Sequence, residues 1–187
     1  MLFQQHLLTG AAPTVSLTYT ATDWLFPTSM SQVNAGAGTV AWAGTGNIGA
    51  DDGSNATCVL NVQASQYLRG SSFDFAGQSI PGGATITGVE ARISRYQTDA
   101  GAQRDLNVLL ADYTDFDPLS LNRAKPDSWP TTETLAVYGG QNDTWGLTLT
   151  KALLETSSFV LLLLATRDVG STVLAVNYMQ LRAHYYF

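Results

Sequence analysis

The sequence contains a single cysteine, Cys58, so no disulfide can form within the chain and its stability must come from packing. Cys58 lies in an alternating run from Thr57 to Val62, on the same side as Leu60 and Val62. No histidine or basic residue lies beside it in the sequence to favour the thiolate form. We therefore expect Cys58 to be a small buried hydrophobic side chain rather than a reactive thiol.

Charged residues are also scarce. They form 13% of the chain, with 9 Lys and Arg against 15 Asp and Glu, which gives a net charge of −6. No long run of basic residues occurs, so direct binding to nucleic acid or to an anionic membrane surface is not expected. So few charges favour a surface that is partly covered by other subunits, because less of that surface has to stay soluble.

Long apolar runs are lacking as well. The longest, from Phe159 to Ala165, is far shorter than the ~20 residues of a membrane-spanning helix, and we expect a central strand there, buried on both faces. Residues 1–15 lack the basic region and the apolar length of a secretory signal, so export by that route is not expected.

Signals for catalysis are few. Of the two histidines, His6 lies near the start of the chain and His184 lies in the last expected strand, and neither belongs to a known motif. The sequence has no G-x-S-x-G turn, no phosphate-binding P-loop and no dinucleotide fingerprint before a helix. We therefore expect neither enzymatic activity nor a cofactor.

Acidic residues leave two alternatives open. The pair Asp51 and Asp52 could form part of a glycosidase site, although adjacent acids in a loop are more typical of turns. Asp112, Asp115 and Asp117 could bind a hard cation such as calcium. That group lacks the glycine and the terminal glutamate of a helix–loop–helix calcium site, so a solvated acidic loop is favoured and no metal is expected.

What the chain does have is alternation between apolar and polar residues, the pattern of half-buried strands. Within residues 85–96, one face carries Val89, Ala91 and Ile93, and the other carries Glu90, Arg92 and Ser94. Near the end of the chain, one face carries Met179, Leu181, Ala183 and Tyr185, and the other carries Tyr178, Gln180, Arg182 and His184. The expected strands cover residues 15–20, 57–62, 73–75, 85–96, 104–111, 159–165 and 173–186.

These strands, together with the length of 187 residues, predict one antiparallel, all-β sandwich that is jelly-roll-like. One short helix is expected near residues 150–156, capped by Thr150. We assign residues 1–13 to an N-terminal arm and residues 14–187 to the sandwich domain.

Two segments are expected to be irregular. Residues 24–55 are rich in glycine and predict loops and short strands. Residues 112–138 contain Pro118, Pro126 and Pro130, which predict a loop with at most an edge strand, since proline cannot donate a hydrogen bond to a sheet. Connections of this length are often functional or contact a partner.

The candidate partner-binding residues are apolar. In the arm they are Leu2, Phe3, Leu7 and Leu8, which are unfavourable in water and are expected to dock on this chain or on a neighbour. Trp129 and Trp145 are candidates because aromatic side chains are enriched at the cores of interfaces. Packing in the protein's own core is the alternative for both tryptophans.

The chain carries a series of turns and strand starts: Asp52-Gly53-Ser54-Asn55-Ala56-Thr57, Leu68, Phe73-Asp74-Phe75, the run from Ile80 to Glu90, Tyr138-Gly139-Gly140, Asp143-Thr144-Trp145-Gly146 and Val176-Asn177-Tyr178. Over about residues 55–186, this series resembles virion structural domains of tailed bacteriophages. The resemblance implies a β-sandwich subunit of the virion without enzymatic activity, such as a capsid decoration (cement) protein that binds the major capsid protein.

The resemblance also implies assembly with copies of itself, with a trimer favoured, and an arm that reaches a neighbouring subunit. It does not separate head from tail. A carbohydrate-binding or receptor-binding module of a head or tail fibre and a tail or baseplate component therefore remain alternatives.

Overall fold

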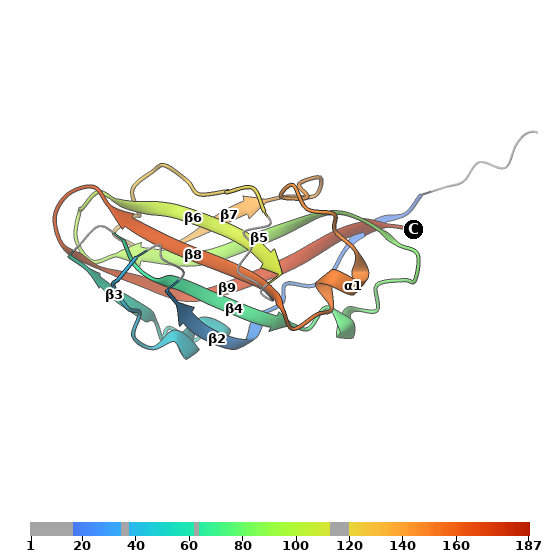
Figure 1. Ribbon diagram of the computed structural model, residues 1–187, viewed down its shortest axis with the longest axis horizontal. Helices are drawn as coiled ribbons and strands as arrows, with labels where there is room; N and C mark the ends of the chain where they lie inside the picture. The colour runs from blue at the N-terminus through green and yellow to red at the C-terminus, as the bar shows by residue number, and fades with distance from the viewer. Residues whose placement is uncertain (1–16, 35–37, 62–63, 113–119) are drawn as a thin grey trace, which may run out of the picture.

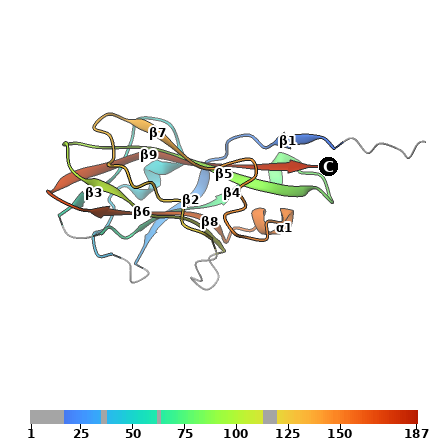
Figure 2. The same ribbon diagram turned by 90° about the horizontal axis from the view of Figure 1, so that it is seen from above.

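The computed structural model describes residues 17–34, 38–61, 64–112 and 120–187. Two antiparallel sheets pack face to face into an elongated sandwich, which Figure 1 shows from one side and Figure 2 shows edge-on. The predicted all-β sandwich is therefore confirmed. The part of the chain that is described contains no helix long and apolar enough to cross a membrane.

The strands are β1 Tyr19–Ala21, β2 Pro27–Val33, β3 Ala56–Leu60, β4 Tyr67–Phe73, β5 Thr85–Gln97, β6 Gln103–Asp112, β7 Thr134–Gly139, β8 Phe159–Arg167 and β9 Thr172–Tyr186. The helical turns are η1 Thr45–Gly49, η2 Ala76–Gln78 and α1 Lys151–Leu154. The described strands form a five-stranded sheet in the order β1-β9-β5-β7, with β3 also paired to β9, and a four-stranded sheet in the order β2-β4-β8-β6.

Successive strands alternate between the two sheets, so each described connection between strands crosses from one layer to the other. From β3 to β9 this alternation places the chain in the crossed arrangement of a jelly roll. Each strand therefore pairs with partners that are distant in sequence. This topology brings β5 and β9 together at the centre of the five-stranded sheet (Figure 1).

Alternation of side chains explains the faces of β5. Val89, Ala91 and Ile93 are fully buried between the sheets, as their spacing predicts. The same period carries Arg95 and Gln97 into the interior at the far end of the strand, where both are almost completely buried. A polar cluster is therefore built into one end of the core.

Strand β8 is covered on both faces, which confirms the central strand expected from its apolar run. Leu161 and Leu163 pack in the main core between the sheets. Val160, Leu162 and Leu164 belong to a second buried cluster on the opposite face of the sheet. Each fully buried side chain of this kind contributes about 1.5–3 kcal/mol relative to an exposed one.

The short helix α1 begins as the sequence predicts. Thr150 adopts an extended backbone, and its Oγ1 accepts a hydrogen bond from the Leu153 N–H (3.1 Å), which satisfies one of the free donors of the first turn. Leu154 is buried against the core, and Lys151 pairs with Glu155 one turn later. Packing of Leu154 therefore holds a helix that is too short to be stable alone.

The long connection after β6 also matches its prediction, since its regular element is the edge strand β7. Before β7, the connection follows the open edge of β6. Asn122 Oδ1 accepts from the Val108 N–H (2.9 Å), and Ser120 Oγ accepts from the Leu110 N–H (2.8 Å). These side chains replace a neighbouring strand, so the edge of β6 is closed.

Three strands differ clearly from the sequence expectations. The first described strand, β1, covers only Tyr19–Ala21 rather than residues 15–20, of which residues 15 and 16 lie outside the described residues. A strand was expected at residues 73–75, whereas β4 covers Tyr67–Phe73 and ends there, because the Phe75 N–H turns back to the Phe73 carbonyl (2.8 Å). Strand β2, expected only as part of a loop-rich region, is polar because it lies at the edge of its sheet.

Candidate interaction face

The outer face of the five-stranded sheet carries a ladder of polar side chains at its centre. In the register of β5 with β9, Glu90 lies opposite Arg182, and Arg92 lies opposite Gln180. These residues point outward because their neighbours in sequence fill the core. The sequence therefore placed each of them on a polar face, but their adjacency depends on the pairing of two distant strands.

Glu90 is the acceptor at the centre of this ladder. Its Oε2 accepts from Arg182 Nε (2.8 Å) and lies 2.7 Å from Arg182 Nη2. His184 Nε2 lies 3.1 Å from the same oxygen. The carboxylate therefore holds the Arg182 guanidinium in one position beside the imidazole, partly shielded from solvent.

Trp24 is held above the ladder by the chain segment that precedes β2. Leu25 exchanges two backbone hydrogen bonds with Leu181 at the edge of β9 (2.8 and 3.0 Å). The half-buried indole lies close to two guanidinium groups, with Arg92 Cζ 4.3 Å and Arg182 Cζ 4.5 Å from the ring centroid. Both distances are within the range of cation–π contacts.

A second aromatic pair extends the same surface. The ring of Tyr178 lies 5.9 Å from Phe26 in an edge-on arrangement, and Arg92 Cζ lies 5.9 Å from the Tyr178 ring. We refer to Trp24, Arg92, Tyr178 and Arg182 as the Trp24 cluster. It presents large, partly exposed rings whose positions are fixed by the charged groups beside them.

Acidic side chains border this face where β7 begins. Asn177 Nδ2 donates to Asp51 Oδ1 (3.2 Å) and to Glu133 Oε1 (2.8 Å), so one buried amide joins two carboxylates. Asp52, by contrast, accepts from the Ser54 N–H (2.8 Å), which is the turn-forming role favoured by the sequence.

The two candidate tryptophans are core residues, which corrects their prediction as partner contacts. Trp129 is 1% exposed and Trp145 is 0% exposed, so neither indole can reach another molecule in this fold. Both indoles can be buried because the polar N–H of each donates to a buried acceptor. The acceptor is Asp105 for Trp129 and the Val89 carbonyl for Trp145. Their alternative role, packing in the core, is confirmed.

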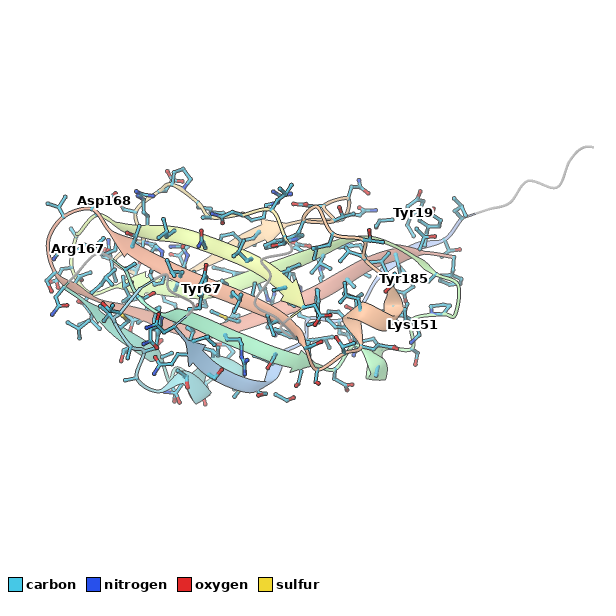
Figure 3. All side chains as sticks on the ribbon, viewed as in Figure 1. Tyr19, Tyr67, Lys151, Arg167, Asp168 and Tyr185 are labelled. Atoms are coloured by element: carbon cyan, nitrogen blue, oxygen red, sulfur yellow. The ribbon has the colours of Figure 1, made fainter. Side chains whose placement is uncertain are left out.

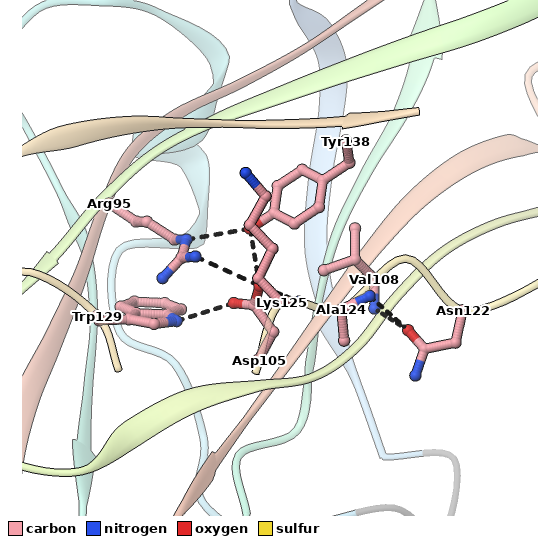
Figure 4. Close-up of polar contacts among 8 residues, drawn as sticks. All are labelled: Arg95, Asp105, Val108, Asn122, Ala124, Lys125, Trp129 and Tyr138. Carbon is pink, nitrogen blue, oxygen red and sulfur yellow. Dashed lines mark hydrogen bonds and ion pairs between the residues drawn. The ribbon is translucent and has the colours of Figure 1, made fainter. Parts of the chain in front are cut away.

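Trp129 belongs to a buried polar network centred on Asp105, which Figure 4 shows. The Asp105 carboxylate accepts from Trp129 Nε1 (2.8 Å), Tyr138 Oη (2.9 Å), the Lys125 N–H (3.1 Å) and Arg95 Nη2 (3.3 Å). Arg95 Cζ also lies 4.7 Å from the Trp129 ring. The network ties the connection between β6 and β7 to both sheets, and its burial makes it structural rather than a site for ligands.

Trp145 is fixed by a different set of contacts. Its indole Nε1–H donates to the Val89 carbonyl (2.8 Å), while its backbone N–H donates to Asp143 Oδ1 (2.8 Å). Arg123 binds Asp143 through two hydrogen bonds of 2.7 Å and thereby keeps the pKa of that carboxyl below its usual value. The indole lies directly against Gly139 at the end of β7.

Burial changes the ionisation of two groups at high pH. Cys58 is 1% exposed, which confirms it as a core residue, and this burial raises the pKa of its thiol to about 12. Burial, followed by the charge of Asp105, raises the pKa of Tyr138 above its ordinary value. Both groups are therefore neutral in the folded protein at pH values where the unfolded chain begins to ionise.

We expect alkaline pH to destabilise the fold. Each raised pKa contributes stability that is fully present below the pKa of the unfolded chain, 9.0 for Cys58 and 10.0 for Tyr138, and is lost as pH rises above it. The free energy of unfolding should fall by about 1.4 kcal/mol per pH unit for each group within its window. Urea unfolding at about pH 8 and about pH 10.5 measures this, and Cys58→Ala should remove the thiol's share. A free energy that stays constant across this range would contradict the assignment.

A shallow hollow of about 360 Å³ lies at the end of the sandwich near α1. It is lined by Thr28, Ser72, Phe73, Asp74, Ala76, Glu155, Thr156 and Ser157. Its two acids already have partners, because Asp74 Oδ1 accepts from the Gly77 N–H (2.9 Å) and Glu155 pairs with Lys151. These contacts fit a role in closing the end of the fold.

The remaining sequence candidates are only partly covered. The arm residues Leu2, Phe3, Leu7 and Leu8 lie outside the described residues, as do Asp115 and Asp117. Within the described ranges, no group of three or more His, Cys, Asp or Glu residues is arranged to hold a metal ion. Figure 3 shows Tyr19 and Tyr185 near one end of the sandwich and Arg167 and Asp168 near the other end.

Sequence reasoning missed the Trp24 cluster as a unit. Arg92 and Arg182 were each assigned to polar strand faces, and Tyr178 was among them. Trp24 lies 68 residues from Arg92 in the chain and farther from Tyr178 and Arg182, and no local pattern marks it as their neighbour. The only signal available was an aromatic residue just before a strand in a loop-rich region.

Comparison of the chain with protein-family models, with curated proteins and with solved structures finds no match.

Proposed function

We propose that this chain is a non-enzymatic structural subunit of a tailed phage particle, and specifically a capsid decoration protein that binds the major capsid shell. The resemblance of its turn motifs to virion domains supports this location. The low content of charged residues, 13% of the chain, supports a protein that works in contact with other subunits.

The observation that carries the proposal is the Trp24 cluster. Trp, Tyr and Arg are the residues that most often dominate binding at protein interfaces. Here two guanidinium groups lie 4.3 and 4.5 Å from one indole, which restrains all three side chains before binding. Such pre-ordering favours affinity, because less side-chain freedom is lost when a partner binds.

Particles that lack this protein provide the test. The purified chain should pellet with such particles, and Trp24→Ala should weaken binding by about 30-fold, the effect of losing one interface residue worth about 2 kcal/mol. Tyr19→Ala is the matched control, because Tyr19 is an exposed aromatic residue, 56% accessible, outside the cluster. A version lacking residues 1–13 measures the contribution of the arm in the same assay.

Two results would count against the proposal. One is wild-type protein that stays in the supernatant, which would remove the shell as the partner. The other is Trp24→Ala binding as well as the wild type, which would remove the cluster as the contact. Circular dichroism of each variant separates loss of binding from loss of folding.

A carbohydrate-binding module of a head or tail fibre is the second candidate. Gln180 and His184 lie on the same face of β9 as Tyr178 and as Arg182, which contacts Trp24, so polar groups lie near aromatic rings, as in many ligand sites. The capsid role is preferred because the Trp24 ring is already engaged by two guanidinium groups. Binding of the wild-type chain, but not of Trp24→Ala, to a glycan array would favour the carbohydrate role instead.

A further inference from the structure

The edge strands of the two sheets differ in how far they are protected from pairing with another strand. The edge of β6 is closed by Ser120 and Asn122, as described above. Strand β3 is covered by Ala43, which exchanges two backbone hydrogen bonds with Thr57 (2.8 and 2.9 Å). Strand β1 is only 3 residues long, and β2 lies against η1. Strand β7 is also at an edge and has 6 residues, but none of these forms of protection is found for it among the described residues.

The direction of the backbone groups of β7 follows from its pairing with β5. The Gly140 N–H donates to the Val89 carbonyl (3.3 Å), and this bond shows which residues of β7 have backbone groups directed towards β5. Because hydrogen-bonded positions alternate along an antiparallel strand, Ala136 and Tyr138 are bonded to β5, whereas the backbone groups of Leu135 and Val137 point away from it. Within the described residues, no hydrogen bond reaches those outward groups.

The side chains of β7 do nothing to prevent pairing with another strand. The sequence Thr134–Gly139 contains no charged residue and no proline, which are the usual means of blocking a sheet edge. Leu135 and Val137 are 41% and 38% exposed on the outer face. An uncharged, unblocked edge with exposed aliphatic side chains is a template for strand addition.

We propose that β7 pairs antiparallel with β7 of a second copy of this chain, around a twofold axis at Ala136. In this register Leu135 of one copy lies opposite Val137 of the other, and both pairs form at positions whose backbone groups point outward. Two Leu–Val contacts then cover the exposed aliphatic side chains, and Ala136 faces its own copy. The five-stranded sheets of the two copies become continuous.

Charge does not oppose a second copy as the occupant. Self-pairing brings no like charges together along β7, although the chain as a whole carries −6. Glu133, the acid next to β7, falls opposite Gly139 of the other copy, which carries no side chain. A shift of the axis to Val137 would place Leu135 opposite Gly139, and a shift to Leu135 would place Glu133 opposite Val137.

A disulfide tests the register directly. In the proposed pair the two Ala136 residues form a position without backbone hydrogen bonds, where Cα atoms are about 4.5 Å apart and can be bridged. Ala136→Cys should form a covalent dimer under mild oxidation. Thr134→Cys, on the same strand face but opposite Tyr138, should not, and neither should the wild type, whose Cys58 is 1% exposed. Equal crosslinking of the two variants, or none, would overturn the register.

Light scattering after size exclusion tests the interface without a new cysteine. The wild type should be a dimer that dissociates on dilution, and Val137→Lys should be a monomer at every concentration. Val59→Lys is the control, because Val59 is an exposed valine (55%) on β3 of the same sheet and should leave the dimer intact. A monomeric wild type, a trimer, or a dimer that survives Val137→Lys would overturn the proposal. This pairing does not depend on capsid binding, which the Trp24→Ala test addresses separately.

Discussion

Replacing Asp105 by alanine is expected to lower the free energy of unfolding by about 3–5 kcal/mol, the usual effect of breaking a buried ion pair on one side. Asp105 is 1% exposed and Arg95 is 4% exposed, so the remaining guanidinium would stay in the core without its counter-ion. The Trp129 N–H and the Tyr138 hydroxyl would lose their acceptor as well. Urea unfolding, followed by tryptophan fluorescence, measures the loss.

The control for Asp105 is an ion pair at the surface. Arg104 binds Asp168 through two hydrogen bonds (2.8 and 3.1 Å), but their side chains are 35% and 44% exposed. Asp168→Ala should therefore leave the unfolding midpoint almost unchanged. Adding Arg95→Met to Asp105→Ala should recover part of the lost stability, because it removes the unpaired charge. Equal effects of Asp105→Ala and Asp168→Ala would mean that burial does not determine the strength of these pairs.

Replacing Gly139 by alanine is expected to lower the free energy of unfolding by about 2–4 kcal/mol, from backbone strain and overpacking together. Gly139 has φ of 69°, in the left-handed region. A Cβ atom there would lie 2.4 Å from the Val89 carbonyl oxygen and 2.4 Å from Trp145 Nε1, which are the two atoms of a buried hydrogen bond. Since the carbonyl belongs to β5, it cannot move without disturbing the sheet.

The next residue provides the matched control. A Cβ atom at Gly140 would meet nothing within 4 Å. Gly140→Ala should therefore change the stability by no more than about 1 kcal/mol, in either direction. Urea unfolding of the two variants decides the point, and a similar loss for both would show that the contact between Gly139 and Trp145 is not the cause.

Local pattern was enough to locate most of the strands. The alternation of Val89, Ala91 and Ile93 predicted β5 nearly to its ends, and the apolar run from Phe159 predicted β8 with both faces covered. Thr150 predicted the start of the helix. Strand β2 fell in a region predicted as loops and short strands, and its bounds could not be set, because an edge strand with polar side chains lacks the apolar alternation on which the prediction depends.

Side-chain roles were harder to predict wherever they depend on distant partners. Trp129 and Trp145 carry no local sign that their N–H groups find acceptors on Asp105 and Val89. Gly139 and Trp145 likewise carry no local sign that they lie against each other in the fold. The Trp24 cluster was invisible for the same reason, since its members meet only after β5 has paired with β9.

The alternation of strands between layers has a consequence for how the protein is made. Strand β9 pairs with β1, β3 and β5, so the five-stranded sheet has no centre until residues 172–186 have left the ribosome. No pair of successive described strands forms a hairpin that could fold earlier on its own. Contacts so distant in sequence are typical of proteins that fold in milliseconds to seconds rather than microseconds. The strands of this sheet that are made earlier therefore lack their central partner until β9 is complete, which leaves their aliphatic side chains prone to aggregation during synthesis.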